Sequence, residues 1–176
     1  MNASAAQGAS IEPTQYLTFL LAQEQFAIGI LGIKEIIEYH GVTEVPMMPP
    51  CVRGVINLRG AVVPVLDLLA RFGRPSSSVT KRTCVVIVEV DRKVVGLVVD
   101  AVNEVLDIAP ADIEPSPSFG AHVRSDFIQG VGKVRGKFVL LLDVNRALSL
   151  DEIGAMDTAL SDTQDAIHES MEQAVA

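Results

Sequence analysis

Short apolar segments rich in valine, each ending at a glycine, a proline or a polar turn, run through most of the chain. Valine occurs 24 times among the 176 residues, whereas tryptophan does not occur at all. A β-branched side chain packs well on a pleated sheet, so this composition favours strands. Segments this short and closely spaced predict roughly ten strands in two similar halves. Such strands form β-barrels or a sandwich rather than alternating strands and helices.

Four pairs of these segments predict β-hairpins, because each pair flanks a short polar turn. In two of them the turn is Arg-Gly, at positions 59–60 and 135–136, and the glycine supplies the positive φ that such a turn requires. Pro64 cannot donate a hydrogen bond, which predicts an edge strand or a bulge. The paired segments are residues 16–21 with 26–30, 52–60 with 61–68, 83–90 with 93–99, and 127–134 with 137–144, and residues 101–108 form one more strand.

The segment after the first hairpin has the spacing of a helix. Ile33, Ile36 and Ile37 fall on one helical face, and Lys34 and Glu35 fall on the other. This pattern predicts a short amphipathic helix of about two turns, with both charged side chains directed outward.

The two ends of the chain differ from its body in composition. Residues 1–15 are small and polar, which predicts a flexible leader and not a signal peptide. Residues 16–149 are expected to form one domain of two subdomains, with a boundary near residues 73–80, where glycine, proline and serine cluster. Residues 150–176 contain seven acidic residues and no lysine or arginine. A capping-box sequence opens this tail, and an amphipathic helix and a solvated, frayed tail both remain open.

No group of residues has the spacing that catalysis or metal binding requires. The histidines at positions 40, 122 and 168 are isolated, and the two cysteines are 33 residues apart, so neither a metal site nor a cofactor is predicted. No serine lies in a nucleophile-elbow sequence. Aspartates at positions 67, 100 and 143 follow apolar strands and are interpreted as strand-end caps rather than paired catalytic carboxylates. We therefore predict that the chain is not an enzyme.

Charge and hydropathy exclude two further classes of protein. The formal net charge is −8 at pH 7, and the acidic excess lies in the tail, so no basic patch marks a nucleic-acid surface. No apolar run approaches the roughly 20 residues that span a bilayer. We expect a cytoplasmic protein with reduced cysteines that neither binds nucleic acid nor inserts into a membrane.

One segment is more specific than any hairpin rule requires. The sequence Gly54-Val-Ile-Asn-Leu-Arg-Gly60, followed by Val63-Pro-Val-Leu-Asp-Leu68, resembles the hallmark segment of the CheW-like chemotaxis coupling proteins. The resemblance extends over about residues 15–149 in the family's order, although Leu69 stands where a basic residue often follows. The other matching segments are Tyr16-Leu-Thr-Phe-Leu, Phe26-Ala-Ile, Ile33-Lys-Glu-Ile-Ile, Val94-Val-Gly-Leu-Val-Val-Asp100, Val102-Asn-Glu-Val105, Ile128-Gln-Gly-Val-Gly and Leu140-Leu-Leu-Asp-Val.

The resemblance implies an all-β fold of two SH3-like, five-stranded β-barrel subdomains that share a hydrophobic core. It implies a non-catalytic adaptor that couples transmembrane methyl-accepting chemoreceptors to a CheA-type histidine kinase, whose regulatory domain shares this fold. Such an adaptor lies in receptor arrays at the inner membrane, and self-association in rings is a further implication. An adaptor for another receptor system, such as surface motility, or a scaffold that fills array positions is the alternative that the sequence leaves open.

The resemblance also assigns positions to two contact surfaces. The receptor-binding positions are Ile33, Glu35, Cys84, Val102 and Val105. The kinase-binding positions are Gly54 and Arg59, and Gly96 matches a structurally demanding glycine between paired strands. From the residues alone, the apolar receptor positions fit a plain core equally well, and Arg59 is equally compatible with a brace within its own fold.

Overall fold

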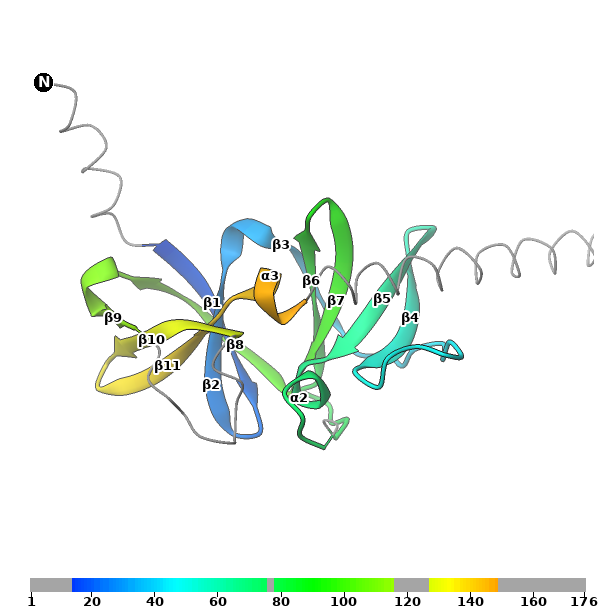
Figure 1. Ribbon diagram of the computed structural model, residues 1–176, viewed down its shortest axis with the longest axis horizontal. Coiled ribbons are helices and arrows are strands. Elements are labelled where there is room, and N and C mark those ends of the chain that lie inside the picture. Colours follow the sequence, from blue (N-terminus) through cyan, green and yellow to red (C-terminus); the bar gives the residue numbers. More distant parts are fainter. Residues whose placement is uncertain (1–13, 76–77, 116–126, 149–176) are drawn as a thin grey trace, which may run out of the picture.

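Two β-sheets packed against each other make up most of the molecule (Figure 1). The structure, a computed structural model, describes residues 14–75, 78–115 and 127–148. The strand orders are β8-β1-β2-β11-β10-β9 and β3-β6-β7-β5-β4. In chain order the elements are β1 Thr14–Leu21, β2 Glu24–Gly29, η1 Ile30–Gly32, β3 Ile33–Glu38, β4 Val52–Leu58, β5 Ala61–Asp67, α2 Leu68–Arg71, β6 Cys84–Val90, β7 Lys93–Val99, β8 Ala101–Ile108, η2 Pro110–Asp112, β9 Ile113–Glu114, β10 Ile128–Val134, β11 Lys137–Leu142 and α3 Val144–Ala147.

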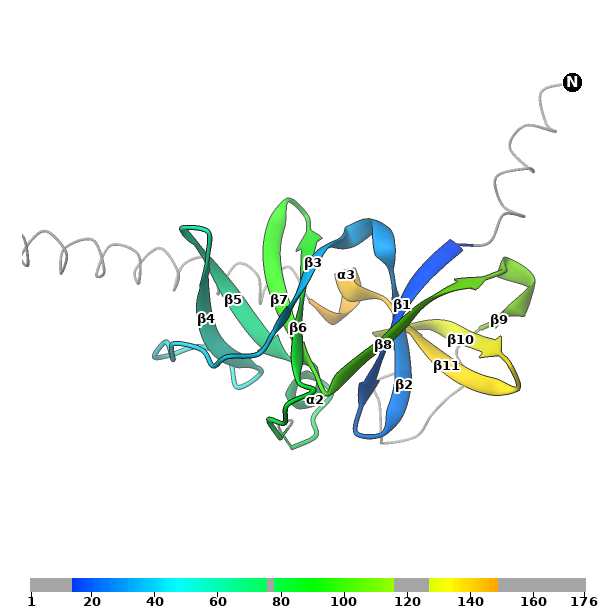
Figure 2. The same cartoon turned by 180° about the vertical axis from the view of Figure 1, so that it is seen from behind.

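We call the six-stranded sheet subdomain 1 and the five-stranded sheet subdomain 2. The predicted mainly-β fold is confirmed, although subdomain 1 gains a sixth strand, the two-residue β9. The chain enters subdomain 2 through η1 and returns to subdomain 1 between β7 and β8, so subdomain 2 is an insertion in the sequence of subdomain 1, and the two lie side by side in space (Figure 2). The predicted boundary near residues 73–80 instead lies within subdomain 2, between α2 and β6. The predicted leader and acidic tail lie almost wholly outside the described residues.

The four predicted hairpins are confirmed as antiparallel pairs. At the turn between β4 and β5, Arg59 and Gly60 have φ values of 54° and 87°. The edge-strand alternative for Pro64 is wrong, because β5 lies inside its sheet, between β4 and β7, although the β4–β5 pair does contain a register shift between Val52 and Gly54. Its cross-strand partner Val55 directs both its N–H and its C=O at Thr43. The missing N–H of Pro64 therefore faces away from β4, and the ladder with β7 begins only at the next residue.

The segment predicted to be a helix is instead strand β3. It pairs antiparallel with β6, and alternate residues from Ile33 onward are half-buried while those between them are exposed. Pairing with the apolar β6 outweighs the helical spacing of the isoleucines, and Ile36 is 42% exposed rather than part of a core. Glu35 consequently shares the half-buried face of Ile33, whereas the helical prediction directed it outward.

A hydrophobic core shared by both sheets holds the subdomains together, as predicted. Four phenylalanine rings run through it in contact, with centroids 6.2, 5.8 and 5.8 Å apart: Phe19, Phe26, Phe72 and Phe127. Arg71 at the end of α2 joins the same region, because its Nε donates to the carbonyl of Ala147 at 2.7 Å. Each sheet also encloses a smaller apolar cluster of its own.

The two subdomains repeat one arrangement of strands. In each, the third and fourth strands of the order are parallel, β2 with β11 and β7 with β5. In each, the fourth strand, β5 or β11, leads to an aspartate that caps a one-turn helix, Asp67 at α2 and Asp143 at α3. Beyond β10 lies β9, and beyond β4 lies the single bridge between Thr43 and Val55. Pairs of equivalent positions can therefore be compared within one chain, and their differences reveal what each surface is adapted to.

Candidate functional site

The arginine of the β4–β5 turn forms an ion pair with edge strand β3. We call the line along which β3 and the β3–β4 connection approach β4 and its turn the seam of subdomain 2. Arg59 Nη2 lies 2.5 Å from Oε2 of Glu35, which is on the opposite edge strand β3. The Arg59 side chain is 78% exposed, whereas that of Glu35 is 23% exposed. The carboxylate thus holds the guanidinium at the turn while most of the donor fork faces solvent. The structure therefore joins a residue predicted to bind the receptor to one predicted to bind the kinase.

Gly54 closes the same seam a few residues away. Val55 and Thr43 exchange two backbone hydrogen bonds of 2.8 Å, which attach the β3–β4 connection to β4. Gly54 has a φ of 153°, and a Cβ atom there would lie 2.2 Å from the carbonyl oxygen of Thr43. Only glycine permits this approach, so the position has a structural role.

Three of the predicted receptor positions lie along the margin of the shared core, with Ile33 and Cys84 at opposite ends of the β3–β6 pair. Ile33, Cys84 and Val102 are partly buried and pack against that core. Burial raises the pKa of the Cys84 thiol, and the neighbouring carboxylate of Glu38 raises it further, although a hydrogen bond with the Val102 backbone partly opposes these effects. Val105 differs from the other three, because it lies farther along β8 and is 51% exposed.

The structural requirement predicted for Gly96 is confirmed. It lies in β7 between β5 and β6, and a Cβ atom there would approach Val85 Cγ1 to 2.7 Å and Ile87 Cδ1 to 3.4 Å. The absence of a side chain lets the two neighbouring strands pack their valines and isoleucines over it.

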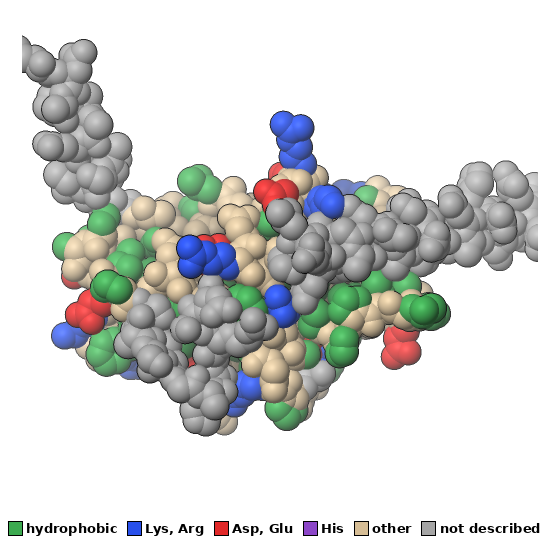
Figure 3. All heavy atoms as spheres, viewed as in Figure 1, with side chains coloured by type: hydrophobic (Ala, Val, Ile, Leu, Met, Phe, Trp, Pro, Cys, Tyr) green, Lys and Arg blue, Asp and Glu red, His purple; other side chains and the backbone are tan. Residues whose placement is uncertain are grey.

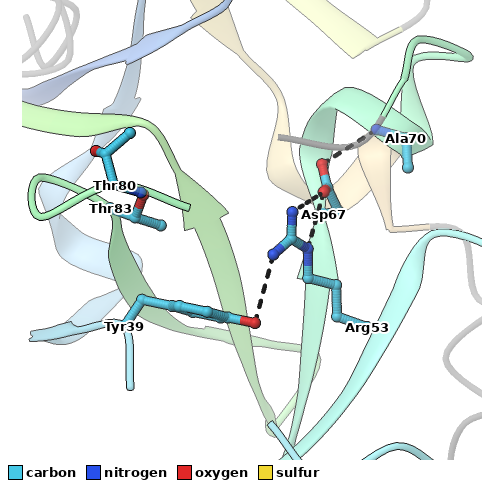
Figure 4. A network of polar contacts seen from close by, with 6 residues as sticks. All are labelled: Tyr39, Arg53, Asp67, Ala70, Thr80 and Thr83. Carbon is cyan, nitrogen blue, oxygen red and sulfur yellow. Dashed lines mark hydrogen bonds and ion pairs between the residues drawn. The ribbon is translucent and has the colours of Figure 1, made fainter. Parts of the chain in front are cut away.

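A second ion pair of subdomain 2, which sequence reasoning missed, is largely buried (Figure 4). Arg53 Nη2 and Nε lie 2.9 and 3.0 Å from Oδ2 of Asp67, and Nη1 donates to the Tyr39 hydroxyl at 3.4 Å. The two charged side chains are 16% and 1% exposed. Burial by itself lowers the pKa of Arg53, but the hydrogen bonds with Tyr39 and Asp67 and the charge of Asp67 raise it overall. The sequence did hold one signal for this pair, because Arg53 is a charged residue within an otherwise apolar strand segment.

The turn between β10 and β11 repeats the ion pair of the seam. Arg135 has a φ of 52°, close to the 54° of Arg59, and its Nη1 lies 3.5 Å from Oε1 of Glu104. Glu104 is on β8, the strand of subdomain 1 that corresponds to β3. The repeated Arg-Gly dipeptide was visible in the sequence, but its carboxylate partner was not.

The predicted strand-end aspartates act as caps. Asp67 accepts from the backbone N–H of Ala70 and Asp143 from that of Arg146, both at 3.2 Å. Asp100 accepts from the N–H of Ala22 at 2.8 Å. Among the described residues no three metal-ligating side chains gather, and no helix is long and apolar enough to cross a bilayer.

The fold and the site together define a two-subdomain β-protein that presents an arginine turn and a partly apolar margin to its surroundings. The chain belongs to the CheW-like family, because the family model of the CheW-like domain matches residues 15–152.

Relatives and a solved structure agree with this membership. Chemotaxis protein CheW of Klebsiella aerogenes is 34% identical over 143 residues, which cover 81% of this chain and 86% of that protein. Chemotaxis protein CheW of Rhizobium meliloti is 33% identical over 138 residues, 78% and 89% of the two chains. The crystal structure of the scaffolding protein TtCheW from Thermoanaerobacter tengcongensis superimposes with a TM-score of 0.72 at 31% identity, covering 80% of this chain and 90% of that one.

Proposed function

We propose that this protein is a non-catalytic adaptor that couples the cytoplasmic tips of chemoreceptors to a CheA-type histidine kinase in chemotaxis arrays. Membership of the CheW-like family over residues 15–152 carries the proposal. Its place is then the cytoplasm, at the inner membrane through the arrays, and self-association in rings belongs to the same proposal.

The arrangement of the predicted contact residues supports a division of labour between two surfaces. The margin formed by Ile33, Cys84 and Val102, extended by the exposed Val105, offers an apolar strip suited to a receptor helix. The exposed Arg59 turn offers a planar fork of donors suited to a carboxylate of the kinase. Because Glu35 contacts Arg59 directly, a change at the receptor strip has a short physical route to the kinase surface.

The first experiment is co-sedimentation with receptor-containing membranes, with and without the kinase. The proposal predicts that the protein pellets with receptor and recruits kinase to the pellet. If the protein stays in the supernatant even when receptor and kinase are both present in excess, the proposed coupling is refuted. The family membership is unaffected by that result.

Replacing Arg59 with alanine is expected to leave the fold intact but to uncouple kinase activity from the receptor state. The side chain is 78% exposed, so its loss costs the fold only about 1 kcal/mol or less. Its loss also removes the charged fork that a partner carboxylate would contact. The measurement is ATP-dependent kinase phosphorylation in a reconstituted receptor–kinase mixture, with and without attractant.

Two control variants show which role of the arginine matters. Arg135→Ala removes the equivalent turn arginine of subdomain 1 and should leave kinase control unchanged. The exchanged pair Glu35→Arg with Arg59→Glu preserves an ion pair across the seam but reverses the charge offered to a partner. Restored kinase control in the exchanged pair would contradict the proposed contact and assign Arg59 to a purely internal brace.

Placing a charge at Val105 is expected to weaken receptor binding more than kinase binding. Val105 is 51% exposed, so Val105→Asp is tolerated by the fold but puts a solvated carboxylate into an apolar contact. Val79→Asp is the matched control, because Val79 is 55% exposed and lies outside the strip. Binding of each variant to receptor and to kinase is measured separately, and equal losses for both partners would contradict the assignment of Val105 to the receptor surface.

A further inference from the structure

Subdomain 1 carries a hollow of mixed polar and apolar lining outside the surfaces discussed above. The hollow has a volume of about 580 Å³ and lies between β1, β2, β8 and β11. Its apolar lining consists of Leu20, Phe138 and Leu140. Phe138 is 66% exposed, which is unusual for so large an apolar side chain. The exposed ring and the two leucines offer apolar contacts to a segment that docks in the hollow.

Comparison of the two subdomains shows that this exposure is not a requirement of the fold. When the strands are aligned on the caps Asp67 and Asp143, Phe138 and Leu140 of β11 correspond to Val62 and Pro64 of β5. Val62 is half-buried and Pro64 is buried. The same framework therefore accommodates smaller, better covered residues at these two positions, so the exposed Phe138 is not required by the fold.

Two lysines lie beside the hollow. Lys133 lies directly opposite Phe138 across the β10–β11 pair, and Lys137 lines the hollow. Neither lysine forms an ion pair with any residue in the described ranges, and both are exposed. Glu24 is the one carboxylate among the lining residues. Figure 3 shows apolar, acidic and basic side chains side by side at the end of the molecule that carries this hairpin.

The chain contains a segment with the complementary chemistry. Residues 149–176 carry seven carboxylate side chains and no lysine or arginine. Their large apolar residues recur at helical spacing, so that one face of such a segment would be apolar and the rest acidic. Five of the residues at this spacing are Ile153, Met156, Leu160, Ile167 and Met171.

The attachment point of this segment brings it within reach of the hollow. Leu148, the last described residue, is 1% exposed and therefore fixed in the shared core. The six residues of β11 span about 20 Å at the strand rise of roughly 3.3 Å per residue. The following 28 residues extend about 42 Å even as a helix, at 1.5 Å per residue. Binding within one chain also benefits from a high effective concentration.

We propose that residues 149–176 dock on this hollow of their own chain. The apolar residues of the segment cover Leu20, Phe138 and Leu140, and its carboxylates lie beside Lys133 and Lys137. The proposal is independent of the coupling function, since it concerns a contact within the chain.

The absence of tryptophan from the sequence allows a direct test in the full-length chain. The variant Phe138→Trp introduces a single indole at the hollow. Docking predicts blue-shifted emission and slow quenching by acrylamide. The additional substitutions Met156→Ser and Leu160→Ser should shift the emission to the red and increase quenching. Higher salt should act in the same direction, because it screens the lysine–carboxylate attraction.

The matched control places the indole elsewhere. Leu31→Trp lies at a position that is 95% exposed, and its emission should not respond to the tail substitutions. Circular dichroism checks that each variant is folded. The proposal is overturned if the Phe138→Trp emission is the same with and without the tail substitutions. It is equally overturned if the shielding increases with protein concentration, which would assign the hollow to a second copy of the chain.

Discussion

Gly54→Val is expected to destabilise the folded chain by about 4 kcal/mol or more, a loss seen only when a core, strain or network feature is broken. The Cβ atom would lie 2.2 Å from the Thr43 carbonyl oxygen and 2.8 Å from its carbonyl carbon, both of which belong to the backbone. The seam of subdomain 2 would have to open to relieve this overlap. Denaturant unfolding followed by circular dichroism measures the change in free energy.

Gly60→Ala is a control that measures the cost of a positive φ for a residue with a side chain, without the steric overlap that occurs at position 54. Gly60 also has a positive φ, 87°, but no atom lies within 4 Å of its added Cβ position. We expect it to lose only about 1–2 kcal/mol. Equal losses in the two variants would show that the seam yields easily. Because Gly54→Val disturbs the fold, a loss of kinase engagement in it would not by itself identify a contact with the kinase.

Asp67→Ala is expected to cost about 3–5 kcal/mol, because it leaves the Arg53 guanidinium buried without its counter-charge. The carboxylate is 1% exposed and also caps α2 through the N–H of Ala70. Asp143→Ala is the matched control. Asp143 caps α3 in the same way, but its partner Arg146 is 68% exposed, so only the cap, about 1 kcal/mol, is lost.

A second substitution tests the cause of this loss. Arg53→Leu in the Asp67→Ala background removes the uncompensated charge, so most of the stability should return, apart from the cap. Thermal or denaturant unfolding of the three variants and of the unmodified chain measures the recovery. If the double variant is as unstable as Asp67→Ala alone, the buried charge is not the source of the destabilisation.

The hairpins could be predicted from the sequence because their determinants are local. The Arg-Gly dipeptides at 59–60 and 135–136 fix the turns, and the apolar runs on either side fix the strands. The helix predicted at Ile33 failed for the opposite reason. Five residues are too few to separate helical from alternating spacing, and the choice is made by β6, whose position along the chain is distant.

The candidate site could be predicted only in part. The family resemblance indicated Glu35 and Arg59 separately, but their ion pair depends on the closure of subdomain 2, in which the two edge strands of the sheet approach each other. The burial of Arg53 against Asp67 depends on the same closure. Contacts made by closing a barrel join residues without any regular spacing, so the sequence carries no periodic signal for them.

The nesting of subdomain 2 within subdomain 1 also sets an order of events during synthesis. Every strand of subdomain 2 lies between β3 and β7, so this sheet can form once that continuous stretch has left the ribosome. Subdomain 1 has to wait, because β2 pairs in parallel with β11, where Phe26 meets Leu140. Long-range parallel pairing of this kind is slow and leaves strand edges open in the meantime. The β1–β2 hairpin is thus the part of the nascent chain that remains longest without its neighbouring strands. Until β11 is available, the completed sheet of subdomain 2 is the folded surface beside it.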